Sequence, residues 1–374
     1  MLCAVNTKDK MIFRKILKNI LPYSVVIKIK DARHTFINDY CKYVASGNKF
    51  LLNETKSKFE NIVSVQGFGY SGSGAVLDLL REYSNCRVLG YVDKEGSKAS
   101  SNESMAEIDF VRLSGGLFEI ENSIESNNIF INDALLNRFV KLVDNSVLYR
   151  HNDLLRNVFL SFFTELVDFS IPNLKKTYYN GHLYSEEGRA SIFFLKNCTV
   201  DNYREKCKCF LTSLFNLMYE KGNKLLVVDQ LFSDFEFDMQ KNLQYIPNLK
   251  TIVVIRDIRD IYVFAKTNNV EWIPHYNVDI FIKWISKCYK NFDVNSKEYL
   301  VIRFEDLIRN YANTVSKLET YLSIDNLFHT KQNLFFDPKY SEKNVGIWMC
   351  KYAEYSQDLD RITKTLPQYC YNLI

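Results

Sequence analysis

The chain of 374 residues carries 48 Lys and Arg against 44 Asp and Glu, with 47% hydrophobic and 25% charged residues. A formal net charge of +4 is too small for the basic footprint of a dedicated nucleic-acid-binding protein, so no nucleic-acid partner is expected. The balanced composition also excludes disordered, collagen-like and coiled-coil chains. We therefore expect a globular protein with a sizeable core.

The cysteine pattern and the hydropathy pattern predict a cytoplasmic protein. The nine cysteines include no CxxC pair, so free thiols in a reducing compartment are expected rather than a zinc site. No apolar run reaches the roughly 18 to 20 residues of a membrane span. The amino-terminal stretch also lacks the pattern of a secretory signal.

Residues 10–21 repeat apolar side chains at helical spacing, with basic side chains on the opposite face. This pattern is typical of a helix that lies on an anionic membrane, which would place the protein peripherally at the inner membrane face. It is equally typical of a helix packed on the protein with its basic face in solvent. Both interpretations stay open. We interpret residues 1–58 as a lead-in and residues 59–374 as the main domain.

From residue 61 onward, short apolar runs alternate with helical patterns. Strands are expected at residues 61–66, 87–92, 224–230, 251–255 and 299–304. Helices are expected at residues 75–83, 134–143, 154–167, 278–292 and 311–322. Continuous apolar runs are typical of buried parallel strands, and their alternation with helices predicts an α/β fold with a mostly parallel, doubly wound sheet. Residues 105–220 are interpreted as a mainly helical insertion that caps the acceptor side.

The segment Gly67–Gly74 is a glycine-rich turn between the first strand and a helix, an arrangement that binds anions. A P-loop would need a lysine where this segment ends in Ser-Gly. The GxGxxG match from Gly67 to Gly72, with Asp93 to bind a ribose hydroxyl, favours a Rossmann-type NAD(P)-dependent oxidoreductase. Glycines that serve only the path of the turn are the structural alternative.

Four segments, in order along residues 62 to about 366, resemble the PAPS-dependent sulfotransferases, where PAPS is 3′-phosphoadenosine 5′-phosphosulfate. The first, Tyr70–Gly74, resembles their 5′-phosphosulfate loop, and Ile255–Asp260 is similar to their strand-terminal Arg-Asp-Pro-Arg-Asp segment. Val301–Leu307 resembles their late strand ending in Phe-Glu-Asp-Leu, and Lys343–Trp348 their basic–Gly–x–Trp segment. The resemblance is closest to carbohydrate-modifying members and implies the P-loop-kinase type of α/β fold.

The resemblance implies a PAPS donor, the product PAP (3′-phosphoadenosine 5′-phosphate), and a hydroxyl of a carbohydrate-type acceptor. It implies that Arg256 grips the 3′-phosphate, since a guanidinium can bind phosphate bidentately, and that Lys343 adds positive charge. No metal is required, because fixed charges and dipoles can neutralise the donor. The residues implied to hold the 5′ end are Gly69, Tyr70, Ser71, Gly72, Ser73 and Gly74.

Three residues depart from the family pattern. Tyr70 stands where many members carry Lys or Arg, Ile258 replaces a common proline, and Phe264 replaces a serine. Without the charge at position 70, the stabilisation of the bridging oxygen falls to a tyrosine hydroxyl. A catalytically degenerate nucleotide-binding protein is therefore an alternative to an active enzyme.

Sulfuryl transfer to a hydroxyl needs a side chain that accepts the proton. Glu107 is one predicted base, because it follows the serine-rich loop after the second strand, where some family members carry a glutamate base. His182 is the other, because its Asn-Gly-His-Leu turn would expose the imidazole. His151 and Asp229 are further candidates.

Overall fold

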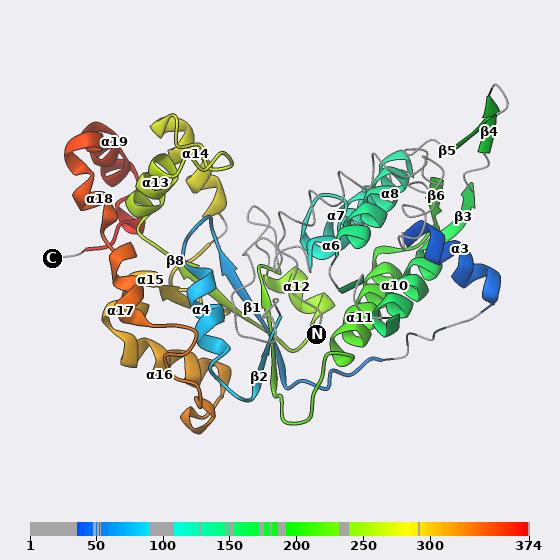
Figure 1. The fold of residues 1–374 in the computed structure, drawn as a ribbon, viewed down its shortest axis with the longest axis horizontal. Coiled ribbons are helices and arrows are strands. Elements are labelled where there is room, and N and C mark those ends of the chain that lie inside the picture. Colours follow the sequence, from blue (N-terminus) through cyan, green and yellow to red (C-terminus); the bar gives the residue numbers. More distant parts are fainter. Residues whose placement is uncertain are drawn as a thin grey trace, which may run out of the picture.

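The fold was analysed in a computed structural model of the chain. The described residues are 36–47, 50, 52, 54–89, 108–126, 129–146, 148–149, 153–171, 176–179, 182–185, 192–231, 239–290 and 292–372. They form two lobes, an α/β lobe and a helical lobe (Figure 1). The predicted amphipathic helix at residues 10–21 lies outside the described residues. Within the described residues, no helix is both long enough and apolar enough to cross a bilayer.

A five-stranded sheet forms the centre of the α/β lobe, in the order β2-β7-β1-β8-β9. Its strands are β1 (Asn61–Gly67), β2 (Cys86–Val88), β7 (Leu225–Asp229), β8 (Leu249–Ile255) and β9 (Leu300–Arg303). All four neighbouring pairs are parallel. Every residue of β7 is buried, as its continuous apolar run predicts. The predicted fold class, a mostly parallel doubly wound α/β sheet, is confirmed.

Both faces of the sheet are covered, because alternate residues of a strand point to opposite faces. Val63 of β1 and Ile252 of β8 lie in one hydrophobic core, together with residues of α4, α15 and α16. Ile62 and Val253 lie in the other, with residues of α13, α14 and α19. The helices of this lobe are α4 (Ser73–Leu80), α12 (Met239–Tyr245), α13 (Ile258–Thr267), α14 (Val278–Cys288), α15 (Phe304–Arg309), α16 (Tyr311–Leu322), α17 (Pro338–Ser341), α18 (Ile347–Cys350) and α19 (Tyr352–Thr365).

The helical lobe comprises α3 (Phe36–Ser46), α6 (Asp109–Arg112), α7 (Leu117–Glu125), α8 (Ile129–Asn145), α10 (Asp153–Leu166) and α11 (Val200–Asn216). Aromatic rings fill its core, and the Phe36 ring of α3 lies 4.9 Å from that of Phe163 on α10. The lobe also holds two antiparallel strand pairs that the helical patterns did not predict. These are β3 (Val167–Ile171) with β6 (Ile192–Leu195), and β4 (Lys176–Tyr179) with β5 (His182–Ser185).

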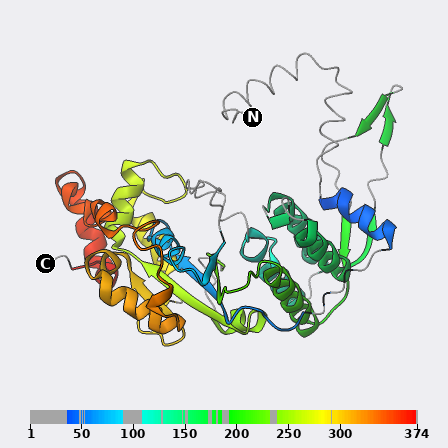
Figure 2. The ribbon, with the colours of Figure 1, turned by 60° about the horizontal axis from the view of Figure 1, so that its bottom comes forward.

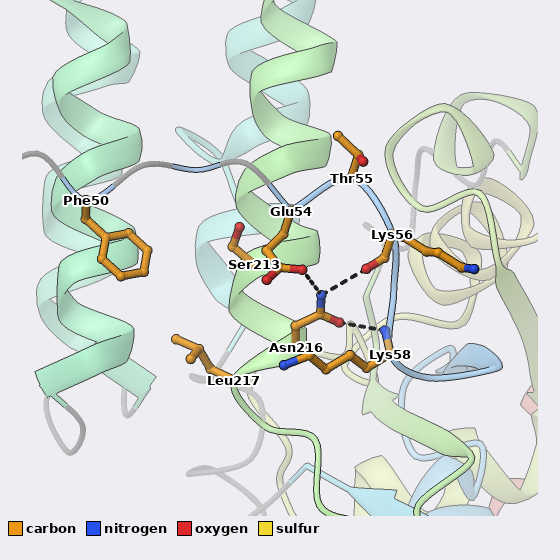
Figure 3. A pocket seen from close by; sticks show the side chains of 8 residues that line it. All are labelled: Phe50, Glu54, Thr55, Lys56, Lys58, Ser213, Asn216 and Leu217. Carbon is orange, nitrogen blue, oxygen red and sulfur yellow. Dashed lines mark hydrogen bonds between the residues drawn. The ribbon is translucent and has the colours of Figure 1, made fainter.

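The chain passes from the helical lobe into β1 through a segment that Asn216 holds in place (Figure 3). The Asn216 amide donates to Glu54 Oε2 and to the Lys56 carbonyl, at 2.8 and 3.0 Å, and accepts from the Lys58 N–H at 2.7 Å. These residues line a cavity of about 380 Å³ near the amino-terminal end of β1. Helix α3, which belongs to the predicted lead-in, packs within the helical lobe. The predicted division of the chain into a lead-in and a main domain at residue 59 stays a prediction.

Candidate functional site

The turn between β1 and α4 is held in a conformation that suits glycine. Gly69 and Gly72 have φ of 52° and 97°, in the left-handed region. Tyr70 also has a positive φ, 55°, which is unfavourable for a bulky residue and persists only where the surroundings impose it. The Tyr70 side chain is 45% exposed. The turn therefore presents a strained, exposed tyrosine at the end of a buried strand.

Close packing around the turn leaves no room for side chains at three glycines. A Cβ at Gly67 would lie 2.6 Å from Ser71 Oγ, and one at Gly69 would lie 2.9 Å from the Trp284 ring. A Cβ at Gly72 would overlap the ring of Phe304, the first residue after β9. By contrast, a Cβ at Gly74 would meet nothing within 4 Å. The glycines at 67, 69 and 72 thus serve the path of the turn.

Several backbone N–H groups of the turn have no protein acceptor in the described chain. The Phe68 N–H donates to Ser71 Oγ at 3.1 Å, and the Ala75 N–H donates to the Gly72 carbonyl at 3.0 Å. Within the described chain, the N–H groups from Ser71 to Gly74 donate to no protein acceptor. They lie at the start of α4, where the helix dipole favours negative charge. These are the groups that an oxyanion site needs, and binding of an anion at this turn stays a prediction.

Arg256 follows β8 and joins this turn to a distant segment. The residue is 5% exposed, and its guanidinium donates through Nη1 to the Tyr70 carbonyl at 3.2 Å and through Nη2 to the Asn344 carbonyl. It also lies 5.2 Å from the centre of the Phe304 ring. Its Nε is buried without a hydrogen-bond partner, and burial lowers the pKa of the group. Arg256 thus holds the two loops together, and its predicted phosphate contact stays a prediction.

The residues after Arg256 fix the Lys343–Trp348 segment. Asp260 is fully buried and accepts from the N–H groups of Gly346 and Trp348, at 2.8 and 2.9 Å. The Arg259 guanidinium lies 3.9 Å above the Trp348 ring. The Lys343 side chain is exposed, with its amine 3.8 Å from the centre of the Tyr340 ring. The segment that Arg256 contacts through Asn344 therefore also carries an exposed cation, Lys343.

The fourth segment reaches the same place through Glu305, at the start of α15. Its fully buried carboxylate accepts from the Asp257 N–H at 2.8 Å. Burial raises the pKa of Glu305 to about 7 and that of Asp260 to about 6, because it disfavours the charged form. The four segments that resemble sulfotransferases in sequence therefore meet in one cluster at the carboxyl edge of the sheet.

The predicted bases lie in different places. His182 is on β5, at the outer end of the helical lobe and away from the sheet in both views (Figures 1 and 2), so the structure does not bring it to the turn. Glu107 and His151 lie outside the described residues. Asp229 ends β7, 8% exposed and paired in register with Val65 of β1. It is the described candidate that lies at the same sheet edge as the turn.

A cluster of aromatic side chains beside the turn was missed by sequence reasoning. The Tyr70 ring stacks on Trp272 at 5.5 Å and packs against Phe264 at 4.7 Å. Trp272 is 57% exposed, and Trp284 packs edge-on against it at 6.4 Å. These residues are far apart in the chain and share no motif. The chain has only 3 tryptophans, and two of them, Trp272 and Trp284, lie 12 residues apart; this was the available sequence signal for the cluster.

The strand order bears on the oxidoreductase alternative. In the dinucleotide-binding fold the second strand lies beside the first, in the order 3-2-1-4-5-6. Here β7 lies between β2 and β1, so the end of the second core strand is one strand further from the turn. Asp93, the predicted ribose ligand, lies outside the described residues. The sheet therefore does not favour a nicotinamide site despite the GxGxxG match.

Comparisons with known proteins gave limited similarity. No protein-family model matches the chain. No curated protein matches it. Among solved structures, sulfotransferase STF9 from Mycobacterium avium is similar, with a TM-score of 0.35 and 9% identity over 85% of this chain and 80% of that one. Sulfotransferase STF1 from Mycobacterium tuberculosis H37Rv gives a TM-score of 0.33 and 11% identity over 83% and 81%. Structural similarity with TM-scores and sequence identities this low does not show a shared activity.

Two glycine substitutions in the turn should have opposite effects on stability. Gly72→Ala places a side chain at a positive φ and against Phe304, and should lower the free energy of unfolding by about 2 to 5 kcal/mol. Gly74→Ala, in open space inside α4, should be neutral or stabilising by up to about 1 kcal/mol. Urea unfolding of both variants measures this. Equal effects would contradict the described turn.

The buried carboxylates should make stability fall as pH rises. The pKa of Glu305 is raised from 4.5 unfolded to about 7 folded, so the folded state binds more protons between these values. The stability that protonated Glu305 contributes to the folded state is fully present below about pH 4.5 and is lost as the pH rises through 7. Glu305→Gln should reduce the loss of unfolding free energy between pH 5 and pH 8 by about 2 to 3 kcal/mol, measured by urea unfolding at both values. An unchanged pH dependence would count against the buried carboxylate.

Proposed function

We propose that the protein is a sulfotransferase that moves a sulfuryl group from PAPS to a hydroxyl of a carbohydrate-type acceptor. The observation that carries this proposal is the meeting of the four segments at one sheet edge. Their shared cluster combines backbone N–H groups without protein acceptors, an arginine that contacts the turn, and an exposed lysine on the segment that the arginine also contacts. A donor with phosphates at two positions needs such a set of anion-binding groups.

The residues of the turn fit the 5′ end of the donor. The N–H groups of Gly72 to Gly74 and the Ser73 hydroxyl would bind the phosphate, while the Ser71 hydroxyl already fixes the turn by accepting from Phe68. Lys343 would add charge from the neighbouring segment. Arg256 contributes positive charge beneath the turn, and direct contact with the 3′-phosphate would require exchange of one of its carbonyl bonds.

When bound, PAPS supplies the sulfuryl group and the leaving phosphate. Tyr70 stands at the exposed edge of the turn, so its hydroxyl would donate a hydrogen bond to the bridging oxygen that gains charge. A hydroxyl carries no formal charge, so this stabilisation is weaker than that of a lysine. In the proposed reaction, an uncharged hydrogen-bond donor, the Tyr70 hydroxyl, would therefore take the place of a lysine at this position.

Asp229 is the residue we assign as proton acceptor. Adjacent strands lie about 4.8 Å apart with a rise of about 3.3 Å per residue, which puts its Cα about 8 Å from that of Gly67, two residues beyond its partner Val65. In the proposed step, an acceptor oxygen bonds to sulfur, the bond from sulfur to the bridging oxygen breaks, and the proton moves to the Asp229 carboxylate. Arg112 of α6 donates to Gln230 Oε1 at 3.3 Å, so the helical lobe reaches this edge.

A charge reversal at the turn tests the donor site. Ser73→Asp should weaken PAP binding at least about tenfold in calorimetry, because two negative charges would meet a few ångströms apart. Stability should be kept or raised by about 0.3 to 1 kcal/mol, since an acidic residue suits a helix amino terminus.

The matched control is Ser316→Asp, which adds the same charge at an exposed position of α16 and should leave PAP affinity unchanged. Titration with NAD(H) accompanies both. Binding of NAD(H) in place of PAP would refute the proposal and favour the oxidoreductase. Tight PAP binding without transfer to any hydroxyl would indicate the degenerate alternative.

Loss of the carboxylate at position 229 tests the proton acceptor. Asp229→Asn should lower kcat by about 10² to 10⁴-fold, the usual contribution of a positioned general base, while PAP affinity stays within about twofold. Transfer of radiolabelled sulfate to a saccharide acceptor gives kcat, and calorimetry gives the affinity. An unchanged kcat would exclude Asp229 as the proton acceptor and leave Glu107 as the predicted base.

A further inference from the structure

Four aromatic side chains form a surface beside the anion-binding turn, and we call Tyr70, Phe264, Trp272 and Trp284 the aromatic platform. The Tyr70 and Trp272 rings are 20° from parallel with centroids 5.5 Å apart, and both are exposed, at 45% and 57%. Among the described residues, no Lys or Arg side chain lies over either ring. Two large rings, one of them on the turn itself, thus present apolar surface to water.

The platform is built into the fold. Rings of Trp272 and Trp284 rest against the backbone of Gly69, whose missing Cβ makes room for them. The loop that carries Trp272 is fixed by hydrogen bonds from the Val270 and Ile273 N–H groups, at 3.0 and 3.1 Å. Because the rings are already ordered, a ligand that stacks on them loses little side-chain entropy on binding.

The chemistry of the platform identifies the class of ligand. A ligand that stacks here keeps its outer side in water, because the rings are open to solvent rather than enclosed. A pyranose ring suits this surface, since its C–H face is apolar and its edge carries hydroxyls. The Tyr70 hydroxyl and the Trp272 indole N–H can bond those hydroxyls. Small apolar acceptors are instead largely buried in enclosed pockets.

We propose that the aromatic platform is the acceptor subsite, where the outer face of Trp272 stacks on a pyranose ring of a saccharide, Tyr70 supports the inner face of Trp272, and one saccharide hydroxyl points at the turn. This inference rests on the proposed function for the role of the bound saccharide as acceptor. It gives a use to Phe264, which stands where the resemblance implies a serine. It also gives a use to Tyr70, whose ring stacks on Trp272 although its backbone φ is positive.

The test measures saccharide binding without the donor. Saturation-transfer NMR is recorded with β-1,4-linked tetrasaccharides of glucose, galactose and N-acetylglucosamine. At least one should bind the wild type, and Trp272→Ala should weaken it at least tenfold. Trp272→Phe, which keeps an aromatic face, should restore part of the affinity. Tyr276→Ala, an exposed aromatic of the same loop outside the platform, is the matched control and should change nothing.

Calorimetry with PAP separates the subsite from the donor site. Trp272→Ala should keep PAP affinity within twofold of the wild type, which also shows that the variant is folded. Tyr70→Leu, which removes the ring that supports Trp272 together with the hydroxyl, gives a second variant and should also weaken saccharide binding. Absence of saccharide binding to the wild type, or unchanged binding in both variants, would overturn the inference.

Two further outcomes distinguish failure of the acceptor subsite from failure of the proposed function. Loss of PAP affinity in a folded Trp272→Ala variant would place the adenine ring on the platform and overturn the acceptor subsite, while the proposed function would stand. Saccharide binding that depends on Trp272, in a wild type that does not bind PAP, would support the subsite and refute the sulfotransferase proposal.

Discussion

The burial of five ionisable side chains at the carboxyl edge of the sheet is the constraint on which the site depends. Buried charges are costly unless each is paired and hydrogen-bonded, so the cluster is stable only when every segment that supplies a partner is in place. Asp260 takes N–H groups from the Lys343–Trp348 segment, and Glu305 takes one from the segment after β8. The cluster therefore couples the ends of two strands to a distant carboxy-terminal segment. Its members are Arg256, Asp257, Arg259, Asp260 and Glu305.

Two surfaces of different chemistry adjoin above this cluster. One consists of N–H groups at the start of α4, which suit an oxyanion, and the other of the exposed rings of the aromatic platform. A group-transfer reaction needs its two substrates oriented within contact distance, and fixed neighbouring subsites provide that orientation. In the described structure, the turn and the platform share Tyr70, and the Trp272 and Trp284 rings pack against Gly69 of the turn, so the two surfaces are in direct contact.

Much of the sheet could be predicted because its strands are buried on both faces and read as continuous apolar runs. The strand at residues 251–255 was predicted within β8, and the helix at 311–322 coincides with α16. Strand order could not be predicted, since pairing is a long-range property that local patterns do not encode. The location of His182 could not be predicted for a related reason: it depends on the path of the insertion, where short β-branched and aromatic runs form strand pairs.

Tyr70 connects all of these features. Its carbonyl accepts from Arg256, its N–H belongs to the anion-binding turn, and its ring stacks on Trp272. The positive φ at this residue costs of order 1 to 3 kcal/mol and is maintained by contacts on both sides, the guanidinium below and the indole above. A charged side chain at this position would have to leave the stack to reach a bridging oxygen. In the proposed function, an aromatic ring at this position would therefore help to position the acceptor, while its hydroxyl would be the neutral hydrogen-bond donor to the bridging oxygen.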